Sequence, residues 1–163
     1  MRSGRLRLPV PERGQILQIN ISAGGVPKTP IPRAEVGPLG IVGDGHRYRL
    51  HGGAQKALLL LASEVIDALC AEGWLLFYGA LGENFTTRGL NHRTWQPGQR
   101  FRAGNLLIEL TTPREPCKTL NPYGRGIQKR LLKNNGESGF YAAVLSAGTL
   151  TPDAIIEAVE RVS

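Results

Sequence analysis

The sequence is poor in cysteine and in long apolar runs, which several common metal sites, disulfide frameworks and membrane spans require. It contains two cysteines in 163 residues, which is too few for an iron–sulfur cluster or a four-cysteine zinc site. Two cysteines without an N-terminal signal peptide also argue against a disulfide framework. The longest uninterrupted apolar run, residues 57–62, is far too short to span a bilayer. We therefore expect a soluble, cytoplasmic protein.

Familiar nucleotide-binding and hydrolase loops are missing as well. The sequence contains no Walker A loop, no GxGxxG segment after a predicted strand and no GxSxG elbow. The formal net charge of +7 is compatible with plain solubility. It is equally compatible with an anionic partner, such as a phosphorylated small molecule, nucleic acid or an acidic protein surface. The basic segments 2–13 and 125–133 lack the interleaved aromatic residues of a stacking platform, so nucleic-acid binding is a secondary interpretation.

The composition favours short strands joined by tight turns. There are 21 glycines and 11 prolines, while 41% of the residues are hydrophobic, which is enough for a real core. Alternation predicts a strand over 14–22, with Leu17, Ile19 and Ile21 on one face. Further strands are predicted at 33–45, bending at its glycines, at 56–61, and at 139–150, with a hairpin over 99–112.

Three helices are predicted around these strands. The first covers 63–73, with Ser63 as its cap and Cys70 on its apolar face. The second covers 124–136. The third covers 151–162, with Thr151 as cap and Pro152 at the first helical position. We predict a mainly β protein with peripheral helices, a β-barrel formed by residues 14–163 as one domain, and an irregular Arg/Pro-rich segment at 1–13.

Cys117 lies in an unusual setting for a structural cysteine. The segment "TTPREPCKTLNP" (111–122) places it in a proline-rich bend, with Arg114 three residues before it and Lys118 directly after. Positive charge stabilises the thiolate, which is the reactive and metal-binding form. On these residues alone, a chemical role and an ordinary loop cysteine remain equally open. Cys70, on the apolar face of a predicted helix, is interpreted as a small core residue.

Three other segments carry weaker signals when taken singly. "GDGHRYRLHGG" (43–53) holds His46 and His51, whose spacing is not that of a helical zinc site. "LGENFTTRGL" (81–90) offers hydrogen-bonding groups beside two glycines, and Lys28 follows "GGVP". Alone, each of the two glycine-rich segments fits an ordinary turn, and Lys28 fits a solvated lysine.

Taken together and in order, these segments form a pattern. "GGVPKTPI", "GIVGDGHRYRLHGG", "LGENFTTRGL" and "LTTPREPCKTL" follow one another along the chain. The combination resembles the MOSC domain, named after the C-terminal domain of molybdenum cofactor sulfurase, and the chain is similar to its short, stand-alone bacterial members. The resemblance extends from about residue 14 to about residue 161.

The resemblance implies a β-barrel that binds the molybdenum cofactor, a phosphorylated pterin whose dithiolene holds the metal. Cys117 matches the family's single cysteine and is the implied molybdenum ligand, a role for which a soft thiolate is chemically suited. The implied cofactor-binding residues are Lys28, His51, Asn84, Thr86 and Arg114.

Similar proteins reduce N-hydroxylated compounds, such as hydroxylaminopurines and amidoximes. The resemblance therefore implies an oxidoreductase that acts on a small N-hydroxylated substrate and takes electrons from a separate reductase, because the chain shows no flavin or NAD fingerprint. Sulfur transfer through a persulfide on Cys117 remains open, and so does a cofactor carrier without turnover.

Overall fold

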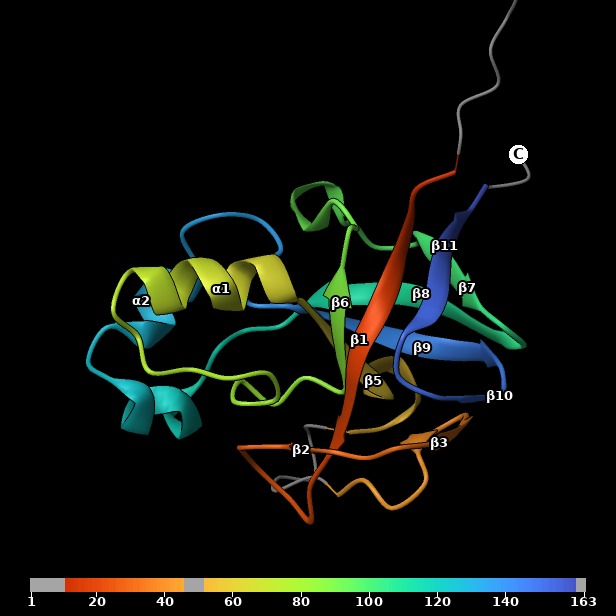
Figure 1. Cartoon of the computed structure of the whole chain (residues 1–163), viewed down its shortest axis with the longest axis horizontal. Coiled ribbons are helices and arrows are strands. Elements are labelled where there is room, and N and C mark those ends of the chain that lie inside the picture. Colours follow the sequence, from red (N-terminus) through yellow and green to blue (C-terminus); the bar gives the residue numbers. More distant parts are fainter. Residues whose placement is uncertain (1–10, 46–51, 161–163) are drawn as a thin grey trace, which may run out of the picture.

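Seven strands close into a barrel, which confirms the predicted mainly β fold (Figure 1). The structure is a computed structural model that describes residues 11–45 and 52–160. Around the barrel the order is β11-β7-β8-β9-β5-β6-β1, and pairing of β1 with β11 closes it. The strands are β1 (Arg13–Ile21), β5 (Leu58–Ala62), β6 (Phe85–Arg88), β7 (Arg100–Ala103), β8 (Leu106–Pro113), β9 (Phe140–Ser146) and β11 (Ala154–Val159). Neighbouring strands are antiparallel except β5 and β6, which are parallel.

Short strands extend this barrel at one end. β2 (Thr29–Pro30) pairs with the end of β1. β3 (Ala34–Gly37) and β4 (Gly40–Ile41) form a tight hairpin, and β10 (Gly148–Leu150) pairs with β3. The predicted strand that bends at glycines is therefore the β3–β4 hairpin, and the predicted strand over 139–150 is divided into β9 and β10.

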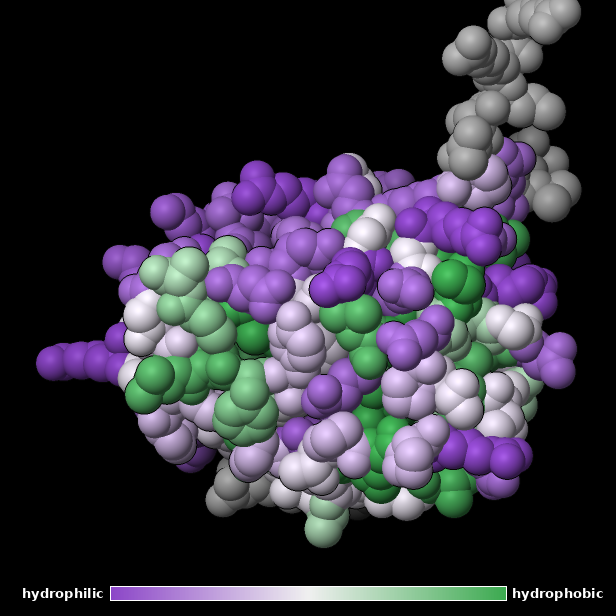
Figure 2. Space-filling model, viewed as in Figure 1, coloured by the Kyte–Doolittle hydropathy of each residue, from purple (hydrophilic) through white to green (hydrophobic). Residues whose placement is uncertain are grey.

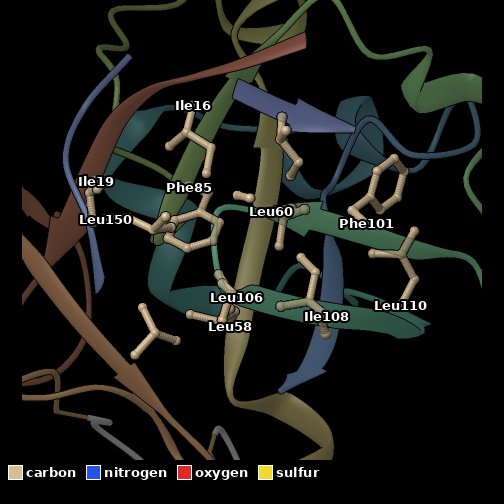
Figure 3. Close-up of a cluster of buried hydrophobic side chains, with 14 of the residues drawn as sticks. Ile16, Ile19, Leu58, Leu60, Phe85, Phe101, Leu106, Ile108, Leu110 and Leu150 are labelled. Carbon is tan, nitrogen blue, oxygen red and sulfur yellow. The ribbon is translucent and has the colours of Figure 1, made fainter. Parts of the chain in front are cut away.

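Two apolar clusters lie on opposite faces of β5. All five residues of this strand are buried, as a strand covered on both faces requires. Leu58 and Leu60 point into the barrel core, where they meet Phe85 and Phe101 (Figure 3). Leu61 belongs to a second cluster beneath the helices α1 (Ser63–Ala71) and α2 (Ile127–Leu131). The apolar run at 56–61 is thus the central strand that the sequence predicted.

For the first strand, the prediction that Leu17 belongs to the buried face is wrong. Ile16 and Ile19 are completely buried, whereas Leu17 is partly exposed. The register between β1 and β6 shifts between Ile16 and Gln18. Such an irregularity changes which residues face the core, so simple alternation fails across it.

The predicted helix at 63–73 is confirmed as α1, but two details differ. Ser63 is not the cap: it is the first helical residue and is buried, and Ala62 occupies the capping position. Cys70 is exposed, and its thiol donates a hydrogen bond to the Leu76 carbonyl over 3.2 Å. Its interpretation as a core residue is wrong, because the buried stripe runs through Val65, Ile66 and Leu69 and ends there.

The two later helix predictions need larger corrections. The predicted helix over 124–136 shrinks to α2, because Gly124 and Gly126 before it adopt positive φ angles of 141° and 87°. The predicted helix over 151–162 is wrong, since this segment forms β11 instead. Pro152 lies in the turn before it, and Asp153 has a φ of 71°. Pairing with β1 on one edge and β7 on the other stabilises the strand over local helix preference.

Apolar side chains also reach the surface. Figure 2 shows green side chains on the left of this face, over the loop between α1 and β6. Leu75 and Phe77 of that loop are exposed. Among the residues that the structure describes, no helix has the length and apolar character to cross a membrane.

Candidate functional site

One pocket collects most of the residues that the sequence singled out. It encloses about 620 Å³, part of it open to solvent. Four of the predicted residues line it, namely Lys28, Asn84, Arg114 and Cys117. They come from the loop after β1, the start of β6 and the turn after β8, which lie far apart in the sequence. The fold therefore assembles the motifs in one place.

The remaining predicted site residues lie elsewhere or outside the description. Thr86 does not line the pocket. It is completely buried in β6, and its hydroxyl donates to Glu83 over 2.9 Å. His51 lies outside the described residues. Thr86 therefore supports the wall of the pocket from behind.

Cys117 stands where the turn after β8 enters the 3₁₀ helix Lys118–Tyr123. Its Sγ lies 2.9 Å from the Thr119 hydroxyl oxygen, and the residue is partly exposed in the pocket. Partial burial opposes ionisation, but hydrogen bonds from the Thr119 side chain and backbone and the charges of Arg114 and Lys118 outweigh it. Together they hold the pKa of the thiol below its ordinary value. Cys117 is thus prepared to act as a thiolate.

This pKa can be tested through Thr119. The change Thr119→Val keeps the shape of the side chain and removes the hydroxyl that lies 2.9 Å from Sγ and donates to it when the sulfur is ionised. We expect the midpoint of the pH dependence of Cys117 alkylation to move upward and the rate near neutral pH to fall, because the thiolate loses a stabilising hydrogen bond. Iodoacetamide labelling followed by mass spectrometry, in a Cys70→Ser background, measures this rate for Cys117 alone. An unchanged midpoint would show that Thr119 does not stabilise the thiolate.

Arg114 is a buried cation held mainly by the backbone. Its Nε donates to the Ser138 carbonyl over 2.9 Å, and its own carbonyl accepts from the Ser138 hydroxyl over 2.6 Å. Its Nη2 is buried and makes no hydrogen bond with the described residues. Burial lowers the pKa of the guanidinium, although an arginine keeps its charge in proteins. The pocket therefore contains a fixed guanidinium with a donor to spare.

Glu83 lies behind the pocket wall and does not line it. Its Oε2 accepts from the Gly79 N–H over 2.9 Å as well as from Thr86. Its Oε1 has no hydrogen-bond partner among the described residues. Complete burial raises the pKa of this carboxyl, which favours its neutral form.

Lys28 and Asn84 are joined by a residue that the sequence analysis did not name. Asp44 forms an ion pair with Lys28, with 2.6 Å between Oδ1 and Nζ, and both side chains are nearly inaccessible. The other carboxylate oxygen accepts from the Asn84 amide over 2.8 Å. Asn84 also binds two backbone groups, the Leu59 N–H at 3.0 Å and the Asn20 carbonyl at 3.1 Å. Asp44 lies in the segment 43–53 that the sequence singled out, but that segment was considered for its histidines and glycines and not for this carboxylate.

Close backbone packing holds Lys28 in this position. The Lys28 N–H donates to the Gly79 carbonyl over 2.9 Å. A Cβ at Gly79 would lie 2.3 Å from the Lys28 carbonyl oxygen, and Gly79 has a φ of +96°. Only glycine permits this approach of the two loops.

Other pocket residues escaped the sequence analysis as well. Tyr141 of β9, Lys56 and Glu115 line the same space. Burial raises the pKa of the Tyr141 phenol, so it stays protonated at neutral pH. Nothing in the alternation of β9 distinguished Tyr141 from any other strand residue.

The donor set suits a bound group that brings most of its own metal ligands. Within residues 11–45 and 52–160, no cluster of three or more His, Cys, Asp or Glu side chains could hold a metal ion. Among the described residues Cys117 therefore offers a single thiolate, and a cofactor that carries its own donors would supply the other ligands. The spare donor of Arg114 fits an anionic group on that cofactor.

The chain is similar in sequence to known proteins. YiiM of Escherichia coli (strain K12) is 35% identical over 132 residues, which is 77% of this chain and 58% of that protein. The chain thus spans little more than half of that relative's length. A protein of Gibberella moniliformis named "Reductase" is 25% identical over 94% of this chain and 30% of its own length.

A solved structure shares the architecture. The crystal structure of YiiM from Geobacillus stearothermophilus superposes with a TM-score of 0.75 and 30% identity, covering 91% of this chain and 76% of that one. The family model of the MOSC domain matches residues 47–157, the larger part of the chain. This chain therefore belongs to the MOSC domain family.

Proposed function

We propose that this protein binds the molybdenum cofactor in the pocket and reduces N-hydroxylated compounds there. One observation carries the proposal: the Cys117 thiol, with its lowered pKa, shares a pocket with the buried Arg114 donor. A soft thiolate and an anion-binding guanidinium are what a phosphorylated, metal-bearing pterin needs from a protein. Association of the MOSC family with this cofactor, and the name of the Gibberella relative, support the same assignment.

A molybdenum cofactor held by Cys117 and Arg114 would supply the chemistry of oxygen-atom abstraction from the substrate. The overall reaction converts an N–OH compound, two electrons and two protons into the N–H compound and water. The chain's part is to hold the cofactor through Cys117 and Arg114 and to orient the substrate in the open pocket. We further propose that a separate reductase supplies the electrons and that the protein is cytoplasmic.

The test is to purify the protein from a host that makes molybdenum cofactor. Near-stoichiometric molybdenum and pterin per chain are expected, together with reduction of an amidoxime when reduced viologen serves as electron donor. Metal and pterin without turnover would instead support a cofactor carrier. A persulfide on Cys117 without molybdenum would support sulfur transfer, which uses the same thiolate.

A further inference from the structure

Asp44 pairs with Lys28, one of the cations that line the pocket, and is not itself among the lining residues. Its Oδ1 lies 2.6 Å from the Lys28 ammonium and also accepts from the Ser22 N–H over 3.1 Å. Its Oδ2 accepts from Asn84 over 2.8 Å. Three partners therefore fix this carboxylate, and the Asp44 side chain is only 2% exposed.

The charge of Lys28 is consequently already compensated. Apart from Asp44, the ammonium has one weak contact among the described residues, 3.5 Å to the Gly45 carbonyl oxygen. The carboxylate oxygen at 2.6 Å takes one of the three N–H donors of the ammonium and offsets its charge, so less of both remains for a phosphate oxygen. An anion that approaches Lys28 must share this cation with Asp44 and is repelled by the same carboxylate.

Arg114 differs from Lys28 in this respect. No salt bridge of Arg114 exists among the described residues, and its Nη2 is buried without a hydrogen-bond partner. The buried carboxyl that acts on it, Glu83, is itself shifted toward the neutral form by burial. The Lys28–Asp44 pair therefore contributes little net charge, so among the described residues attraction for an anion comes from the other cations that line the pocket, Arg114 and Lys56.

We propose that Asp44 is a built-in counter-anion that limits how tightly the pocket binds anions. This inference rests on the proposed function, because it concerns the anionic part of the ligand in the same pocket. The pair keeps a buried ammonium compensated when no ligand is bound. It also keeps the pocket from holding inorganic phosphate as strongly as it would with an uncompensated Lys28.

Four variants test this proposal by the direction in which each changes the affinity for phosphate. Asp44→Asn removes the negative charge at nearly constant shape, and inorganic phosphate should bind about tenfold more tightly. Lys28→Met leaves the carboxylate unpaired, and phosphate should bind about tenfold more weakly. The double variant removes both charges, and phosphate affinity should return to within about threefold of wild type. Arg114→Met should abolish binding.

Isothermal titration of the cofactor-free protein with phosphate measures these affinities, and a thermal melt of each variant checks that it is folded. Asp67→Asn is the matched control. It removes a carboxylate charge from the exposed face of α1, where Asp67 accepts from the Tyr78 hydroxyl, and should leave phosphate affinity unchanged.

If Asp44 had only a structural role, phosphate affinity would change in the opposite direction. In that case Asp44→Asn would weaken phosphate binding, and the double variant would not recover. Either result overturns the proposal, and so does an absence of phosphate binding in every variant. The molybdenum content of wild-type protein is measured separately, so failure here and failure of the proposed function are distinguishable.

Discussion

Replacing Cys117 with serine is expected to remove molybdenum from the purified protein, lowering the metal per chain by more than about tenfold. The described residues offer no cluster of His, Cys, Asp or Glu that could retain the metal in its place. A serine hydroxyl fits the space but is neither soft nor ionised at neutral pH. Molybdenum measured by mass spectrometry, with pterin measured by fluorescence after oxidation, checks the result.

Cys70 provides the control within the same chain. It is exposed on α1 and does not line the pocket, so Cys70→Ser should leave both molybdenum and pterin at wild-type levels. If Cys117→Ser retained as much molybdenum as the wild type, Cys117 would not be the ligand. Loss of molybdenum with retention of pterin would assign Cys117 to the metal alone.

Replacing Asn84 with alanine is expected to lower the free energy of unfolding by about 2–4 kcal/mol. The amide bonds the Leu59 N–H and the Asn20 carbonyl, and both become buried groups without a partner when the amide is removed. It also supports Asp44, so the pocket wall loosens at the same time. Urea unfolding followed by circular dichroism measures the change.

Two further substitutions sharpen this test. Asn84→Asp keeps the shape but places a second carboxylate against Asp44, so it should destabilise the protein at least as much as alanine does. Asn121→Ala removes an exposed amide that accepts from Gln128 and should cost less than about 0.5 kcal/mol. An Asn84→Ala protein as stable as Asn121→Ala would show that the amide does not hold the strands together.

The structure brings four of the residues that the sequence singled out into one pocket, whereas several of the elements around them differ from the prediction. Lys28, Asn84, Arg114 and Cys117 were selected because their motifs occurred together, and the structure brings them to one pocket. Asp44 was not selected, because its role arises only when two distant loops meet. No local pattern records such a contact.

The errors in the fold have a common physical origin. The segment 151–162 carries apolar residues at spacings that suit a helix, yet Ile156 is the residue that enters the core, as part of a strand. Hydrogen bonds from β1 and β7 decide between the two structures, and these partners lie more than fifty residues away in sequence. Leu17 was misplaced for a similar reason, since an irregular register with β6 interrupts its strand.

Closure of the barrel by β11 has a consequence for the order of events during synthesis. β1 is made first among the barrel strands, but its partner in the closing pair, around Ile156, leaves the ribosome last. Until then one edge of β1 and one edge of β7 have unsatisfied backbone donors and acceptors, which can template pairing with another chain. Because so long a loop must close, this step is entropically costly and comes late in folding. The nascent protein therefore depends on its last barrel strand to pair these two edges and close the barrel.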